Sequence, residues 1–173
     1  FTFIDHAFKH GDSLVGVIHE SEVKKLFNNQ SSLFNVLNKK DLDKAIELRK
    51  EVERLSDLEV EKKKELLAKS DALLQSTKEK LAFLSANAID PNGDLEPFSY
   101  LLEFPEVMLD NGGFDAIVGN PPFLGGQKLT GFFGEPYREY LVNYLGHGQR
   151  GSADLVAYFF LRALQLLKPQ GTF

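Results

Sequence analysis

The chain has 173 residues, a formal net charge of -5 at pH 7 and no cysteine. The lack of cysteine excludes disulfides, cysteine-ligated metal sites and thiol nucleophiles, and it disfavours a zinc deaminase. No apolar run approaches the roughly 18 to 20 residues of a membrane helix, so we expect a cytoplasmic protein that does not enter a membrane. The acidic balance also disfavours this chain alone as a strong surface for duplex DNA, because that affinity comes largely from Lys and Arg.

The amino-terminal stretch places aromatic residues among polar ones and then reaches Gly11-Asp12-Ser13. This triplet is typical of a turn after a short strand or loop, so Asp12 is expected at the end of a strand. A capped helix is predicted to begin at Ser21, because apolar residues recur at helical spacing through residue 37.

Residues 41–86 contain no Gly or Pro and are dense in Lys, Glu and Leu. Their apolar residues recur at helical spacing, which predicts a long helix or a helical hairpin with a break near Ser56 and Asp57. An unbroken rod is the alternative. Because acidic residues offset the lysines, a charged insertion with one apolar packing stripe is favoured over an arm that binds DNA or a partner.

A strand is predicted over residues 114–119, after a cluster of turn formers at 89–94 and a return segment at 98–108. The strand is followed directly by Asn120-Pro121-Pro122-Phe123. An Asn at the end of an apolar strand presents an amide oxygen, and the extended backbone before Pro lets a carbonyl point into the same cleft. Two acceptors beside an aromatic ring suit a planar amino group on a flipped base.

Beyond the tetrapeptide, glycines at 125, 126, 131 and 134 predict a flexible loop that closes on a substrate, followed by a short amphipathic helix over 137–144. A second loop is predicted at 146–151. A helix is then expected over 154–167, with Asp154 as its N-cap. Its expected sheet-facing residues are Leu155, Val156, Phe159, Phe160, Ala163, Leu164 and Leu167.

The tetrapeptide resembles motif IV of amino methyltransferases that use S-adenosylmethionine, most closely the N6-adenine DNA methyltransferases. Gly11-Asp12-Ser13-Leu14 resembles a Gly-Asp-Ser-Leu element of that family, and the 152–171 segment resembles its helix and following turn. Residues 102–107 are similar to the lead-in found in type IIG restriction-modification enzymes and their phage-defence relatives.

This resemblance implies an α/β fold: a partial Rossmann-like methyltransferase sheet with a long α-helical insertion. It implies that Asn120, Pro121, Pro122 and Phe123 are catalytic, and that Asp12, Ser13 and Leu14 bind S-adenosylmethionine, with Asp12 on its adenine. The implied substrate is double-stranded DNA, and no metal is implied. Asp12 and Asn120 are expected to meet at the carboxyl ends of neighbouring parallel strands.

The family's principal cofactor loop, of the Asp/Glu-Pro-x-x-Gly-x-Gly type, has no counterpart in these residues. We therefore expect a fragment of a longer polypeptide that is inactive when isolated. Its expected parts are methyltransferase core at 1–19, helical insertion at 20–90 and core with the tetrapeptide at 91–173.

Two other functions fit the sequence. Similar tetrapeptides occur in enzymes that methylate a protein glutamine amide or an RNA guanine amine, which are also planar amines. The chain is alternatively a helical interaction module with an idle methyltransferase remnant. Cofactor binding separates the module from an enzyme.

Overall fold

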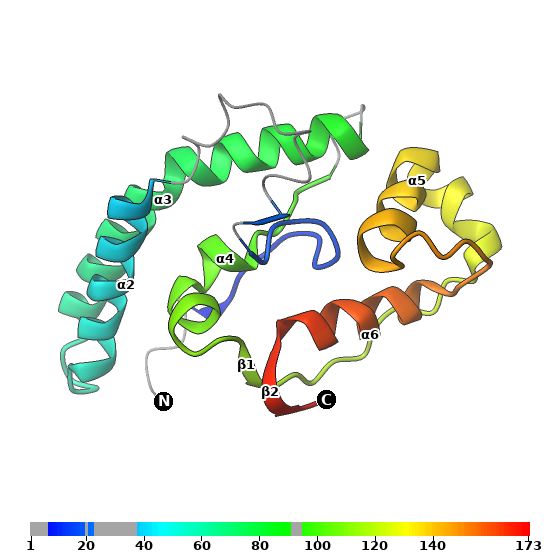
Figure 1. The fold of residues 1–173 in the computed structure, drawn as a ribbon. Helices are drawn as coiled ribbons and strands as arrows, with labels where there is room; N and C mark the ends of the chain where they lie inside the picture. Colours follow the sequence, from blue (N-terminus) through cyan, green and yellow to red (C-terminus); the bar gives the residue numbers. More distant parts are fainter. Residues whose placement is uncertain (1–6, 20, 23–37, 91–94) are drawn as a thin grey trace.

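The computed structural model describes residues 7–19, 21–22, 38–90 and 95–173 (Figure 1). The helices predicted over 21–37 lie almost wholly outside these ranges. In chain order the described elements are α2 (Lys39–Arg54), α3 (Val60–Ile89), α4 (Tyr100–Glu103), the π-helical turn η3 (Glu106–Asp110), β1 (Phe114–Ala116), α5 (Gly126–Tyr140), the π-helical turn η4 (Leu141–Leu145), α6 (Leu155–Leu166) and β2 (Leu167–Thr172).

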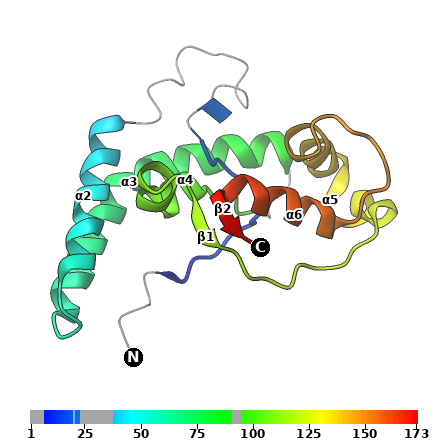
Figure 2. The ribbon, with the colours of Figure 1, turned by 60° about the horizontal axis from the view of Figure 1, so that its bottom comes forward.

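Helix α2 and the amino-terminal part of α3 form an antiparallel hairpin at one end of the molecule, and the rest of α3 runs on across the molecule toward α5 (Figures 1 and 2). The chain breaks at the predicted place, because Leu55 is extended and ends α2. Ser56 and Glu59 then bond reciprocally: the Ser56 hydroxyl donates to Glu59 Oε2 (2.9 Å), and the Glu59 N–H donates to the Ser56 carbonyl (3.1 Å). The unbroken rod is therefore wrong.

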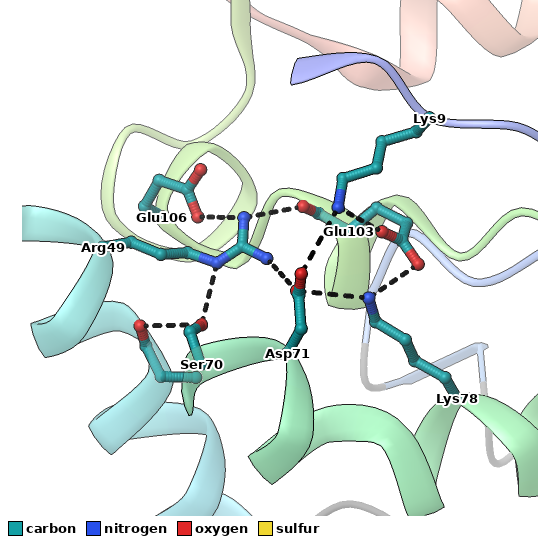
Figure 3. Close-up of polar contacts among 8 residues, drawn as sticks. Lys9, Arg49, Ser70, Asp71, Lys78, Glu103 and Glu106 are labelled. Atoms are coloured by element: carbon teal, nitrogen blue, oxygen red, sulfur yellow. Dashed lines mark hydrogen bonds and ion pairs between the residues drawn. The ribbon is translucent and has the colours of Figure 1, made fainter. Parts of the chain in front are cut away.

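Arg49 joins this hairpin to the rest of the chain (Figure 3). Its side chain is buried and donates to Ser70 Oγ (3.0 Å), Asp71 Oδ1 (2.8 Å) and the Glu103 carbonyl (2.9 Å). Glu106 Oε2 lies 3.5 Å from the same guanidinium. One cation of α2 thus contacts α3, α4 and η3 together.

Two lysines extend this ion network. Lys78 Nζ lies 2.8 Å from Glu103 and 3.6 Å from Asp71, and Lys9 Nζ lies 3.2 Å and 3.8 Å from the same two carboxylates (Figure 3). Apart from Asp71, the side chains of this network are largely buried, so water and salt screen their attraction less than they screen a surface ion pair. The network therefore fixes the amino-terminal segment as well as the hairpin.

Residues 14–18 run through the interior as a buried segment without regular structure. Leu14 and Val15 pack into one apolar cluster with α5, η4 and α6, whereas Val17 and Ile18 pack into a second cluster with the hairpin and α4. Gly16 separates the two pairs at a φ of +148°, and a Cβ there would lie 2.0 Å from the Phe98 carbonyl oxygen. Only glycine permits this approach of two backbones.

The described sheet has two parallel strands, β1 and β2. Phe114 pairs with Leu167 and Ala116 with Thr172, so the register is irregular, and the Ile117 N–H still donates to the Thr172 carbonyl (3.0 Å). The predicted strand over 114–119 is thus regular only at 114–116. Helices with a small parallel sheet are consistent with an α/β fold, and the Rossmann-like arrangement stays a prediction.

The flexible loop predicted after residue 125 is wrong. Residues 126–140 are helical (α5), and the helix is interrupted only at Gly134, with φ 82° and ψ 167°. Leu129 is buried in the apolar cluster, so tertiary packing outweighs the low helix propensity of the glycines. Pro136 follows the break, where a helix can begin without its N–H.

Asp154 is the N-cap of α6, as predicted, because its side chain accepts from the Val156 N–H. The predicted buried face of α6 is wrong in part, since Phe160 and Leu164 are exposed. Tyr158 and Arg162 are buried instead. Arg162 is tolerated inside because its guanidinium finds hydrogen-bond acceptors there.

Replacing Arg49 by Met should lower the free energy of unfolding by about 3 kcal/mol, because the carboxylates that Arg49 contacts lose a buried partner. Equilibrium urea unfolding measures this. Lys69→Met is the matched control: Lys69 forms an exposed pair with Glu65 one helical turn away, and its loss should cost under about 1 kcal/mol. Equal losses in the two variants would contradict the assigned role of Arg49.

Candidate active site

A cavity of about 270 Å³ lies where the chain leaves β1. Residues 117–122 form one wall, and Ser13 and Tyr100 contribute from the segments that lie beside it. Helix α6 contributes Phe159 and Arg162. The cavity thus gathers residues that are more than a hundred positions apart in the sequence.

Asn120 and Pro121 present their acceptors without competition from the residues that the structure describes. In those ranges the Asn120 side chain makes no hydrogen bond, and the Pro121 carbonyl accepts none. Both residues line the cavity, as does Pro122. An amide oxygen and a carbonyl oxygen are therefore available to a ligand that donates two N–H bonds.

The segment that carries these residues is anchored where α6 begins. The Leu124 N–H donates to Asp154 Oδ1 (3.2 Å), and the Leu155 N–H donates to the Leu124 carbonyl (2.9 Å). Gly126 then approaches so closely that a Cβ would lie 2.4 Å from the Ala153 carbonyl oxygen. Asp154 thus caps α6 and fixes the chain just beyond the tetrapeptide.

Phe123 is not among the residues that line this cavity, and its side chain is 79% exposed. Phe159 is the aromatic ring that α6 supplies there, although its sequence position suggested simple core packing. The missed signal is spacing: Phe159, Arg162, Ala163 and Leu166 all line the cavity, at the three- and four-residue intervals of one helix face.

Arg162 is a buried cation in the wall of this cavity. It donates to the Leu14 carbonyl (2.6 Å), the Tyr140 hydroxyl (3.3 Å) and Gln165 Oε1 (3.2 Å). Its Nε is buried and makes no hydrogen bond within the described part of the chain. Arg162 therefore holds the turn at Leu14 against α6 while it keeps one donor unused.

Leu14 itself is fully buried in the apolar core. Its side chain lines neither this cavity nor the larger one that borders Asp12. Only the backbone of Leu14 makes polar contacts in this region. The Leu14 N–H donates to Asp12 Oδ1 (2.8 Å), and the Val15 N–H reaches the same oxygen (3.3 Å). Asp12 thus shapes its own turn with one oxygen, which is the plain structural role of an Asp at such a position.

The second oxygen of Asp12 accepts from the Tyr137 hydroxyl (3.0 Å). Tyr137 is buried, and this burial, together with the Asp12 carboxylate, raises the pKa of Tyr137 well above its usual value. The hydroxyl is therefore protonated at neutral pH and donates to the carboxylate.

Asp12 borders a second, larger cavity of about 770 Å³, lined also by His10, Glu96, Phe132 and Phe133. The neighbouring residue Ser13 borders the cavity that holds Asn120. Asp12 and Asn120 therefore do not share one cavity, contrary to the expectation that they meet, but consecutive residues connect the two hollows.

Metal ligands and membrane helices can be assessed for residues 7–19, 21–22, 38–90 and 95–173. These residues contain no group of three or more His, Cys, Asp or Glu side chains placed to hold a metal ion. Their helices also include none that is both long and apolar enough to cross a bilayer.

Asp154→Ala should lower the free energy of unfolding by about 1–2 kcal/mol, because it removes a helix cap and leaves the Leu124 N–H without its acceptor. Asp154→Asn keeps a side-chain oxygen at the cap, so it should lower the free energy of unfolding by only about 0.5 kcal/mol or less. Urea titration of both variants checks the order. An Asn variant as unstable as the Ala variant would show that the charge, and not the cap, is what matters.

One protein-family model matches the chain, that of the Eco57I restriction-modification methylase, over residues 19–173. No curated protein and no solved structure has significant similarity to it. The matched residues include the whole hairpin, the Asn120 segment and α6. Because the match spans most of its length, the chain belongs to the Eco57I restriction-modification methylase family.

Proposed function

We propose that the protein carrying this chain transfers a methyl group from S-adenosylmethionine to the N6 amine of adenine in double-stranded DNA. Membership of the family indicates a DNA methyltransferase of a restriction-modification system. The observation that supports the finer assignment is the cavity in which Asn120 and Pro121 lie with Ser13 and Phe159. A type IIG enzyme is the arrangement that the lead-in at 102–107 favours.

Asn120 and Pro121 act on the amine through its protons. The lone pair of an aromatic amine is delocalised into the ring, so the nitrogen is a weak nucleophile while it stays planar. Hydrogen bonds from its two N–H groups to the Asn120 amide oxygen and the Pro121 carbonyl favour the pyramidal form that attacks. Pro122 restricts the backbone of Pro121 to extended conformations, which would limit the directions that the Pro121 carbonyl can take.

An aromatic ring is needed to hold a flipped base against these acceptors. Phe159 lines the cavity and is half-buried, so it is already placed for that contact. Phe123 is exposed at the end of the tetrapeptide, where it is free to cover a base that enters. We propose that the base lies between these two rings.

The Asp12 turn fits the nucleoside part of the cofactor. The larger cavity offers a carboxylate acceptor and aromatic side chains, which suit an amino-bearing purine. When bound, S-adenosylmethionine supplies a methyl group on a positively charged sulfur. Asp12 would bind the purine of the cofactor. Ser13, which follows it in the chain, would contact the part of the cofactor that extends toward the Asn120 cavity, and the buried Leu14 would hold that turn in place. The family match begins at residue 19, so this part rests on the cavities and the Gly-Asp-Ser-Leu resemblance.

Asn120→Ala in the full-length protein should lower methyl transfer by about 100-fold or more, because it removes an acceptor that acts on the reacting amine. The affinity for S-adenosylmethionine should change by less than about threefold. The measurement is transfer to unmethylated DNA, with N6-methyladenine identified by mass spectrometry after digestion to nucleosides. Asn143→Ala, at an exposed position of η4, is the matched control. Unchanged turnover of the Asn120 variant would remove the catalytic assignment.

The same assay separates the other functions. Methyl groups found in protein glutamine or RNA guanine would replace adenine as the substrate while keeping the Asn120 chemistry. A full-length protein that binds no S-adenosylmethionine would instead be the helical interaction module. Neither alternative is favoured by a specific contact in the described residues.

A further inference from the structure

The Asp12 carboxylate is held from two sides. Its Oδ1 accepts from the backbone of its own turn, whereas its Oδ2 accepts from Tyr137, 125 positions away on α5. The turn is also tied down at Gly16, whose N–H lies 3.4 Å from the Tyr140 hydroxyl. Two tyrosines of one helix, one turn apart, therefore contact the two ends of the segment that carries Asp12.

The surroundings of Tyr137 hold its hydroxyl in place as a hydrogen-bond donor to Asp12. Its ring is buried and stacks on Phe133, with centroids 4.8 Å apart and planes 24° apart. The stacking fixes the direction of the hydroxyl, and burial with the neighbouring carboxylate keeps it protonated. Tyr137 also lines the larger cavity, so it sets the position of Asp12 from within the wall of that cavity.

We propose that Tyr137 is a positioning residue that makes the Asp12 carboxylate selective for a nucleoside whose purine carries an amino group. This inference rests on the proposed function. A carboxylate accepts hydrogen bonds only, so once Tyr137 fixes its orientation, the remaining acceptor capacity faces one direction. A purine amine placed there is bound, whereas a purine carbonyl presents an acceptor to an acceptor and is rejected.

Without the Tyr137 hydroxyl, Oδ2 loses its partner, and the carboxylate is held only through Oδ1, by the Leu14 and Val15 N–H groups. It would then bind the amine less well and reject the carbonyl less strictly. Because Asn120 lies in the other cavity, the loss should appear in the KM for the cofactor more than in kcat. Selectivity at the purine and turnover at the amine are thus separable.

The test is Tyr137→Phe in the full-length protein, which keeps the ring and its stacking. Calorimetry would measure the binding of S-adenosylhomocysteine and of its analogue with hypoxanthine in place of adenine. We expect the adenine compound to bind about tenfold more weakly, as for one lost hydrogen bond, and the preference over hypoxanthine to fall about tenfold. The loss should appear mainly in the KM for S-adenosylmethionine and much less in kcat.

Tyr144→Phe is the matched control. Tyr144 stacks on Tyr140 much as Tyr137 stacks on Phe133, and its hydroxyl has no hydrogen-bond partner within the described ranges. Its binding and preference should equal those of the wild type. Phe133→Leu is a second route to the same hydroxyl if the Tyr137 variant does not fold. Because Phe133 also lines the cavity, its loss should lower the affinity for both compounds, so the readout is the preference for adenine over hypoxanthine, which should fall about threefold.

Three results would overturn the inference. A Tyr137→Phe variant with unchanged affinity would show that the hydroxyl does not matter to the ligand. Weaker binding with an unchanged preference for adenine would mean that the substitution only loosens the fold. No binding of S-adenosylhomocysteine by the wild type would remove the proposed function and the inference with it, whereas the first two results leave that function standing.

Discussion

The rest of the structure depends on the buried segment at residues 14–18. Its first two side chains belong to the apolar cluster of α5, η4 and α6, and its last two to the cluster of the hairpin and α4. Backbone hydrogen bonds from Phe98 to Val15 (2.6 Å) and from Leu101 to Val17 (3.2 Å) fasten it along its length. Two halves of the molecule are therefore packed onto one short stretch of chain, and a side chain at Gly16 would push that stretch away from Phe98.

The candidate site follows from the same constraint. The turn at Asp12 and Ser13 enters this buried segment directly, so it cannot shift without disturbing both clusters. Arg162 from α6 and the tyrosines of α5 then hold it from the carboxyl-terminal side. The segment after β1 is less constrained, because its contacts with the rest of the chain are concentrated where Leu124 meets Asp154. The turn at Asp12 is thus held from several sides, whereas the segment that carries Asn120 is held mainly at its carboxyl-terminal end.

Sequence patterns predicted the helical hairpin, its break at Ser56 and the cap at Asp154, because each depends on local preferences that neighbouring residues reinforce. They failed where tertiary packing decided. Glycine spacing predicted a loop after residue 125, but α5 forms because Leu129 enters the core. The apolar pattern of α6 predicted that Phe160 is buried, but Phe160 is exposed. Arg162 is buried instead, because distant segments supply its hydrogen-bond acceptors. Asn120, Pro121 and Pro122, which line the cavity, could be proposed as site residues from a local tetrapeptide, whereas the contribution of α6 depended on knowing which face meets the cavity.

The ion network around Arg49 has a mechanical consequence. Helix α2 is 16 residues long, so the turn of the hairpin, where Leu58 is 94% exposed, projects on the order of 20 Å along the hairpin axis. Arg49 lies about 8 Å from the turn-side end of α2, and it contacts Glu103 and Glu106, which precede β1 in the chain. Sliding the hairpin would separate buried charges, which resists relative motion. A force applied at the exposed turn is therefore resisted at α4 and η3, the two elements that directly precede β1.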